Sequence, residues 1–239
     1  MARWQIAETQ KLVELHFGSD QVHRSRHCIR AVQERLRHAR YHFSEARRVL
    51  KEAIDARLPS ESIYAITWPN SGEKYRVLQS ELMKVEAQSI ACANAINSIA
   101  DNLAHVAYLG LGLNLGANSL RERDISAKTV IDVLRREFSP GYGAALHIEQ
   151  LIADPAFNTV AALVNVAKHR GFTESMINID PHDRDERYQF EFGPFRYDGV
   201  SYAEREIEDV LAPAYAAASL AVVSTGIAIH GQLIARTAP

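Results

Sequence analysis

The chain has 239 residues, of which 47% are hydrophobic and 23% are charged, and its formal net charge is −2 at pH 7. This apolar content is too high for a disordered chain, and the glycines and prolines are too few for a fibrous or low-complexity protein. The only two cysteines, Cys28 and Cys92, cannot build a disulfide framework or a four-cysteine zinc site. The N-terminal stretch carries Glu8 and Glu14 and shows no signal-peptide pattern, so we expect a cytoplasmic globular protein.

Apolar residues recur with helical spacing through most of the chain. Between about residues 20 and 57 they fall on one face, at Val22, Ile29, Val32, Leu36, Phe43, Leu50 and Ile54. In the next long segment the only formal charge between Glu86 and Arg121 is Asp101, which is typical of a helix in the centre of a bundle. In chain order, we expect helices over residues 2–17, 20–57, 73–115, 127–137, 142–153 and 155–169, and over about 203–235 with a kink or break at Pro213.

Before the last expected helix, the spacing of the apolar residues changes from the helical period to that of short strands. Short strands are expected over residues 175–180 and 188–192 and in a hairpin that turns at Asp198-Gly199. The loop over residues 58–72 joins two long helices, which should pack antiparallel. We therefore predict a mostly α fold: one helical-bundle domain over residues 1–239, with a β-hairpin insertion at about 175–202.

The last helix has a rival interpretation as a membrane span, because Val210 to Ala235 contains no formal charge. This segment also holds Pro213, His230 and Gln232, and several acidic residues precede it. The composition favours a buried bundle helix and no membrane association.

Charge is distributed unevenly along the chain. Residues 23–51 carry nine arginines and lysines against two glutamates, whereas residues 174–209 carry eleven acids against four arginines. A basic helix of this kind attracts nucleic-acid phosphates, although it can equally be a solvated face that pairs with the acidic segment. The candidate nucleic-acid contacts are Arg24, Arg30, Arg35, Arg40, Arg47 and Arg48.

Four histidines, His23, His27, His38 and His42, lie on the face opposite the apolar stripe of this helix. Imidazoles four residues apart can share a metal ion, but a metal site needs a third ligand that the pattern does not supply. No Glu-x-x-His pair of the di-iron bundle type is present. An exposed or subunit-interface face is the favoured interpretation, and we expect neither a metal nor a cofactor.

The stretch from Arg37 to His42, Arg-His-Ala-Arg-Tyr-His, resembles the Arg and His motif of the HEPN superfamily of helical-bundle proteins. Many of these proteins are metal-independent ribonucleases that work as dimers. The resemblance implies that His42 acts as general acid or base and that Arg37 stabilises charge on a phosphate.

A second cluster of polar and basic residues lies at the C-terminal end of the helix that precedes Gly171. Lys168, His169 and Arg170 complement the helix dipole there, and Asn165 shares the face of His169. Together with the stretch from Ser98 to His105, this cluster resembles uncharacterised bacterial helical proteins linked to HEPN, over about residues 75–235. The resemblance adds Asn165, Lys168, His169 and Arg170 as candidate catalytic residues.

Asn97, Asp101 and His105 form a polar row on an otherwise apolar helix. Asp101 could orient His105 as a base, but such a row more often fixes helix register as a satisfied polar seam. A site would be favoured if this row faced Asn165 and His169 across the bundle.

No P-loop, dinucleotide-binding glycine motif, zincin motif or hydrolase elbow occurs in the sequence. The leading expectation is a bacterial HEPN-like homodimer that binds or cleaves RNA in a defence or toxin system. The alternative is a non-catalytic oligomeric bundle that binds a partner or nucleic acid through the basic face of the helix over residues 20–57.

Overall fold

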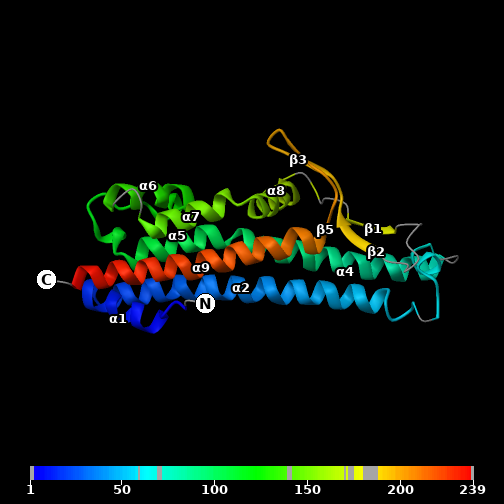
Figure 1. Cartoon of the computed structure of the whole chain (residues 1–239), viewed down its shortest axis with the longest axis horizontal. Coiled ribbons are helices and arrows are strands. Elements are labelled where there is room, and N and C mark those ends of the chain that lie inside the picture. The colour runs from blue at the N-terminus through cyan, green and yellow to red at the C-terminus, as the bar shows by residue number, and fades with distance from the viewer. Residues whose placement is uncertain are drawn as a thin grey trace. The chain divides into compact units, whose positions relative to one another are not determined.

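In a computed structural model of the chain, the structure describes residues 3–58, 60–68, 72–138, 142–169, 171, 175–179 and 188–237 (Figure 1). Helix accounts for 76% of the described residues, which confirms the mostly α fold. The helices are α1 (Ile6–Phe17), α2 (Ser19–Ala53), α3 (Ile63–Thr67), α4 (Gly72–Asn97), α5 (Ile99–Gly110), α6 (Ala127–Glu137), α7 (Gly143–Ala153), α8 (Pro155–His169) and α9 (Ile207–Thr237), with 3₁₀ turns η1 (Leu113–Leu115) and η2 (Glu122–Asp124). The strands are β1 (Ser175–Ile179), β2 (Tyr188–Phe192), β3 (Phe195–Tyr197), β4 (Val200–Tyr202) and β5 (Arg205–Glu206).

Two of the expected helix ends and the expected hairpin turn lie at residues suited to those positions. Gly18 adopts a positive φ of 84° between α1 and α2, and its N–H donates to Glu14 O. Asp154 caps α8, since its Oδ1 accepts hydrogen bonds of 2.9 Å from the N–H groups of Ala156 and Phe157. Asp198 and Gly199 both have positive φ, as the tight turn between β3 and β4 requires.

Several helix boundaries differ from the expectation. The predicted 58–72 loop contains α3, which Ser62 caps by accepting from Ala65 N–H. The predicted 73–115 helix is broken at Ser98 into α4 and α5. It ends early because Gly112 takes a left-handed conformation, with a φ of 68°, against the Phe17 ring. The last helix begins at Ile207, since residues 205 and 206 pair with β2, and it continues through Pro213.

The strands form two small antiparallel groups. β2 lies between β1 and β5 in a three-stranded sheet, with Ile177 opposite Phe190 and Glu191 opposite Glu206. β3 and β4 form a separate hairpin. These strands confirm the predicted hairpin insertion before the C-terminal helix.

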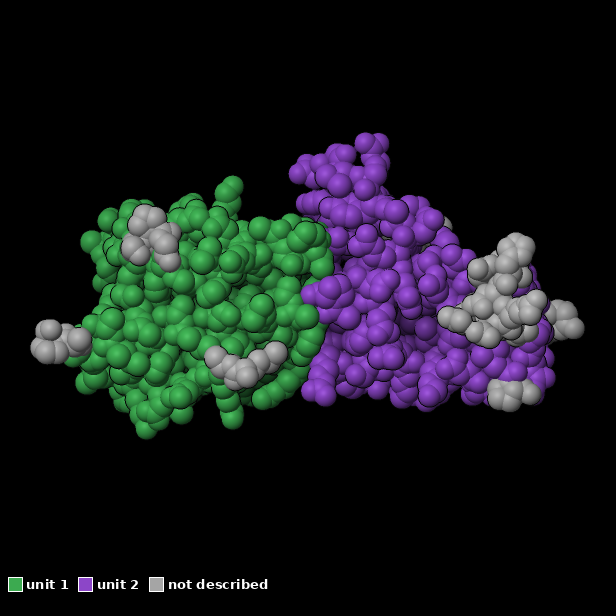
Figure 2. Space-filling model, viewed as in Figure 1, with its two compact units in different colours: residues 1–37, 96–158, 214–239 green, residues 38–95, 159–213 purple. Residues whose placement is uncertain are grey.

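The chain divides into two compact units (Figure 2). Unit 1 comprises residues 1–37, 96–158 and 214–239, and unit 2 comprises residues 38–95 and 159–213. Four helices contribute residues to both units: α2, α4, α8 and α9. The single domain over residues 1–239 stays a prediction.

In unit 1, α5 is the most deeply buried helix, as its scarcity of charge predicts, with Leu103, Val106 and Tyr108 at most 1% exposed. The unit 1 part of α9 is held by hydrogen bonds. His16 Nε2 donates to Leu233 O at 2.9 Å, and Thr9 Oγ1 contacts His230 Nδ1 at 3.1 Å.

α9 is also the one helix in the described part of the chain that is long and apolar enough to cross a membrane. The most apolar window of α9 has a mean hydropathy of 1.7, and 44% of that window is buried inside the protein. The hydrogen bonds to His16 and Thr9 are those of a packed bundle helix, although Leu220, Ile227 and Ile234 remain exposed on α9.

In unit 2, the second half of α2 runs antiparallel to α4, as predicted. His42 is hydrogen-bonded to Gln88, and Leu50 lines a cavity together with Val85. Residue numbers rise from His42 to Leu50 along α2 but fall from Gln88 to Val85 along α4, so the two helices run in opposite directions. A buried cluster of Ala53, Ile54, Ile63 and Ile66 closes this end of the unit, with Ile177 and Ile179 of β1 packed against it. Burial of the two isoleucines of α3 explains why the expected loop forms a helical turn.

Candidate functional site

Several histidine side chains and one arginine lie around a cavity of about 640 Å³ in unit 1. The first half of α2 contributes His23, Arg24 and His27, and α5 contributes His105. The segment after α5 completes the wall with Asn114, Ser119, Leu120, Glu122 and Ile125. We call this the imidazole cavity.

Two hydrogen-bonded pairs hold the walls of the imidazole cavity in place. The buried Gln21 amide donates to Leu109 O, and it exchanges hydrogen bonds of 2.6 and 3.1 Å with the Asn114 amide. The buried Tyr108 hydroxyl accepts a 2.6 Å hydrogen bond from Leu120 N–H. These contacts fix α2 and the 113–125 segment to α5, so the cavity wall has a defined shape.

The side chains on the cavity wall differ in how far they are open to solvent. His23, Arg24 and His27 are exposed, and His105 is half-buried. Arg24 makes no ion pair with any residue that the structure describes, and Glu122 is the only carboxylate among the described residues of the wall. The cavity therefore brings one guanidinium and one carboxylate together with three imidazoles.

Cys28 also lines the cavity, but it is not an activated nucleophile. Burial, and then the nearby Glu122 carboxylate, raise the pKa of the Cys28 thiol. Since the thiolate is the reactive form, this thiol stays protonated and inert near neutral pH.

Asp101 lies one turn from His105 on α5, and its carboxylate has a different partner. Its Oδ1 accepts a 2.9 Å hydrogen bond from Ala127 N–H, at the first residue of α6. Asp101 is exposed and is not hydrogen-bonded to His105 among the described contacts. This bond joins α5 to α6, as the polar-seam interpretation expects.

The residues of the HEPN-like stretch are distributed over both units. Arg37 is exposed and belongs to unit 1, whereas His42 belongs to unit 2 and is half-buried. A 2.6 Å hydrogen bond joins His42 Nδ1 to Gln88 Oε1 on α4. His42 therefore has a structural partner on the neighbouring helix.

The cluster at the end of α8 belongs to unit 2, whereas Asp101 and His105 belong to unit 1. Asn165 Nδ2 donates to Ala161 O one turn earlier, at 2.9 Å. Lys168 and His169 are exposed in the last turn, where cations complement the helix dipole. Arg170 lies outside the described residues.

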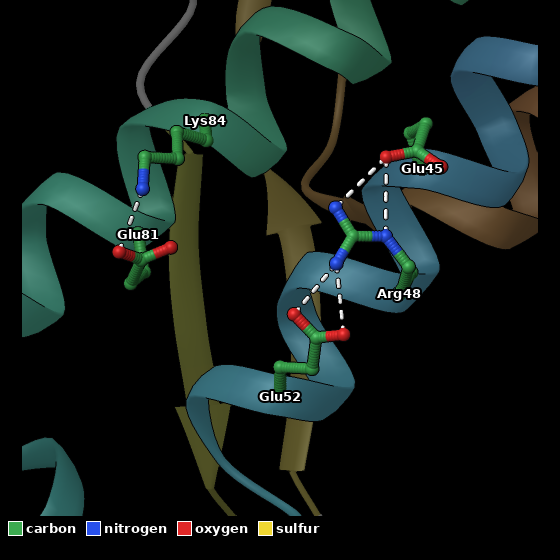
Figure 3. A network of polar contacts seen from close by, with 5 residues as sticks. All are labelled: Glu45, Arg48, Glu52, Glu81 and Lys84. Carbon is green, nitrogen blue, oxygen red and sulfur yellow. Dashed lines mark hydrogen bonds and ion pairs between the residues drawn. The ribbon is translucent and has the colours of Figure 1, made fainter.

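The predicted basic face of α2 divides into paired and unpaired arginines. Arg30 is bound to Glu34 at 2.7 Å and Arg47 to Glu208 at 3.7 Å, while Arg48 binds both Glu45 and Glu52 (Figure 3). The contact of Arg47 with Glu208 is the kind of pairing with the acidic segment that the charge distribution predicts. Exposed arginines of α2 without an ion pair to any described residue are Arg24, Arg26, Arg35, Arg37 and Arg40.

The sequence pattern identified His23 and His27 as a face of α2 and His105 as part of a row on α5, but it gave no sign that they meet. The only signal was the shared residue type, because contacts between helices distant in sequence leave no local periodicity. No group of three or more His, Cys, Asp or Glu side chains placed to share a metal ion occurs in the described ranges.

No family model matches the sequence, and neither a curated protein nor a solved structure is significantly similar to the chain. The HEPN-like resemblance therefore stays a prediction that depends on the quoted motifs.

Proposed function

We propose that this protein binds RNA and cleaves it without a metal ion, as a HEPN-like ribonuclease whose reacting groups line the imidazole cavity. The observation that carries the proposal is that His23, Arg24, His27 and His105 line one cavity of about 640 Å³. The expected setting is that of the sequence: a bacterial, cytoplasmic homodimer in a defence or toxin system.

The chemistry needs two proton transfers and one anion site. One imidazole removes the proton of a ribose 2′-hydroxyl, whose oxygen attacks the adjacent phosphorus. A second imidazole gives a proton to the departing 5′-oxygen, so the products are a 2′,3′-cyclic phosphate and a free 5′-hydroxyl. His105 acts with one of the two α2 imidazoles in these steps, and Arg24 binds the phosphate while its charge develops.

Binding of the RNA strand extends along α2 from the cavity. Arg24 and Arg35 are both exposed, and their separation of eleven residues places them on the same helix face about 16 Å apart. Neither arginine has an acidic partner in the described part of the chain. Both guanidinium groups are therefore free to contact separate, non-adjacent phosphates of one strand.

The test is incubation of a mixed RNA pool with the full chain in EDTA, beside the variants His23→Ala, His27→Ala and His105→Ala. We expect cleavage by the wild type, with loss of at least about 100-fold in His105→Ala and in one α2 variant. His147→Ala is the matched control, because His147 lies in unit 1 outside the cavity and its ring is hydrogen-bonded to Gln150.

Two further variants separate this site from the positions that the sequence predicts. Loss of cleavage in His42→Ala or His169→Ala, with His105→Ala active, would transfer the catalytic assignment to unit 2 and overturn the cavity site. Cleavage that EDTA abolishes would overturn the metal-independent mechanism.

The non-catalytic alternative is favoured by the unpaired Arg35, Arg37 and Arg40, since exposed cations can bind RNA without any reaction. RNA binding by the wild type that survives in all three cavity variants, with no cleavage, would establish this alternative.

A further inference from the structure

Two of the histidines that line the imidazole cavity, His23 and His27, lie four residues apart on α2. Side chains at this spacing are neighbours on one helix face, with about 5–6 Å between their Cβ atoms. Two imidazoles so placed can each direct one nitrogen at a single metal ion, as in zinc enzymes that carry two histidines four residues apart on a helix. The regular backbone of α2 therefore brings the two rings within reach of one ion.

The helix segment that carries this pair is anchored on its other side. Gln21 and Ser25 are buried, and the Gln21 amide donates a hydrogen bond to Leu109 O on α5. His23 and His27 therefore project from the exposed side of a helix whose position is fixed. Because ligands on a rigid helix need only side-chain rotation to meet, the pair is well suited to hold an ion between its rings.

Both rings of the pair are open to solvent and available to a ligand. His23 and His27 are exposed, and neither ring is hydrogen-bonded or ion-paired to a residue that the structure describes. The second histidine pair of α2 with this spacing, His38 and His42, differs in this respect. A 2.6 Å hydrogen bond holds His42 Nδ1 to Gln88 Oε1 on α4. Of the two pairs, only the one at the cavity has both rings free of described partners.

The charges on the cavity wall balance around the pair. Arg24 and Glu122 are the formally charged side chains among the described residues of the wall, so there is no net excess of positive charge. The pKa of the Cys28 thiol is raised by burial and then by the charge of Glu122, which places this carboxylate near the residue that follows His27. A carboxylate near the pair attracts a divalent cation.

We propose that His23 and His27 together bind one Zn²⁺ ion, and that this ion inhibits the reaction of the imidazole cavity. Imidazole nitrogen is a preferred ligand of zinc, at about 2.0–2.1 Å, and water completes the coordination of the ion. A site that holds zinc permanently has at least three protein ligands, and the described ranges contain no such group. Two imidazoles give instead a site that fills and empties as the zinc concentration changes.

Zinc at this pair removes the groups that the reaction needs. An imidazole nitrogen that binds a metal ion has no lone pair with which to accept the proton of a 2′-hydroxyl. The inhibition rests on the proposed ribonuclease function, whereas the zinc site rests on the histidine pair alone. Separate measurements therefore test the two.

Calorimetric titration of the full, untagged chain with zinc chloride tests the site without any RNA. His23→Ala and His27→Ala should each lower the affinity for the most tightly bound Zn²⁺ at least about tenfold, because loss of even an outer-shell partner of a metal site costs about 10- to 100-fold. His38→Ala is the matched control, at an exposed histidine of the same helix, and should bind zinc as the wild type does. Magnesium chloride should give no heat of binding at the pair, since Mg²⁺ prefers oxygen ligands.

In the cleavage assay, zinc chloride should inhibit the wild type and EDTA should restore the rate. No binding of zinc, unchanged affinity in His23→Ala or His27→Ala, or an equal loss in His38→Ala would overturn the zinc site. Zinc binding by the pair without cleavage under any condition would establish the site and overturn only the ribonuclease. Cleavage at the full rate with the zinc site filled would overturn the inhibition.

Discussion

Trp4 and Gly226 are packed so closely that a Cβ atom at residue 226 would overlap the indole ring. The indole is only 6% exposed, and its Nε1 donates a 2.9 Å hydrogen bond to Thr9 Oγ1. The Thr9 hydroxyl is in turn hydrogen-bonded to His230 on α9. The segment before α1 is thereby fastened to the C-terminal helix, at a glycine that leaves room for a ring.

Gly226→Ala should therefore destabilise the protein by about 1–3 kcal/mol, because the added methyl group overpacks a filled site. Gly231→Ala is the control on the same helix. No atom lies within 4 Å of a Cβ placed at residue 231, so alanine there should be neutral or stabilising by up to about 1 kcal/mol. Denaturant unfolding of both variants measures the difference, and equal stability of Gly226→Ala and the wild type would contradict this packing.

Most of the fold could be predicted because its signals are local. The Asp154-Pro155 pair and Gly18 determine helix ends through their own backbone preferences. The boundaries that were wrong depend on contacts distant in sequence: α3 forms because Ile63 and Ile66 are buried against the end of α2. Similarly, α5 stops where Phe17 packs on Gly112.

The candidate site was predictable only in part, for the same reason. Residue chemistry identified His105 and Arg24, but the imidazole cavity exists because the Gln21 and Asn114 amides pair across 93 positions of the chain. Helical periodicity carries no information on such a pair. The favoured motif pointed instead to His42, whose ring is hydrogen-bonded to Gln88.

The unpaired arginines make a prediction about salt dependence. Replacing both Arg24 and Arg35 with glutamine should weaken RNA binding. The slope of log affinity against log salt concentration should become smaller by about 0.7 for each phosphate that the protein no longer binds. Arg30→Gln should change the slope less, because Glu34 already neutralises Arg30 at 2.7 Å. Fluorescence anisotropy with a 2′-O-methyl RNA, which cannot be cleaved, measures binding alone. An unchanged slope in the double variant would exclude this face.

The two thiols should react slowly in the folded protein. Burial raises the pKa of Cys92 to about 12, and this residue is 1% exposed. Cys28 is half-buried, and its pKa is raised by burial and by Glu122. Alkylation by iodoacetamide at pH 8, followed by mass spectrometry, should label Cys28 before Cys92 and label both rapidly after unfolding. Labelling of Cys92 at the unfolded rate in the native protein would contradict its burial.

Glu206 gives the fold a dependence on pH with a defined sign. Burial raises its pKa above the ordinary 4.5, with smaller contributions from the charges of Asp209, Glu208 and Glu191. Because the folded state holds the Glu206 proton more tightly than the unfolded state, ionisation of Glu206 destabilises the fold at neutral pH. Its favourable contribution is complete below pH 4.5 and is lost as the pH rises through the folded pKa.

Glu206→Gln should therefore raise the melting temperature at pH 7, by the equivalent of less than about 1 kcal/mol because the carboxyl is largely solvated. The advantage over the wild type should disappear below pH 4.5, where the carboxyl is protonated in both states. Glu204→Gln, at an exposed residue outside the pairing of β5 with β2, should show no such crossover. Thermal unfolding of the three proteins between pH 4 and pH 7 measures this, and a stabilisation by Glu206→Gln that is independent of pH would show that the charge of Glu206 is not its cause.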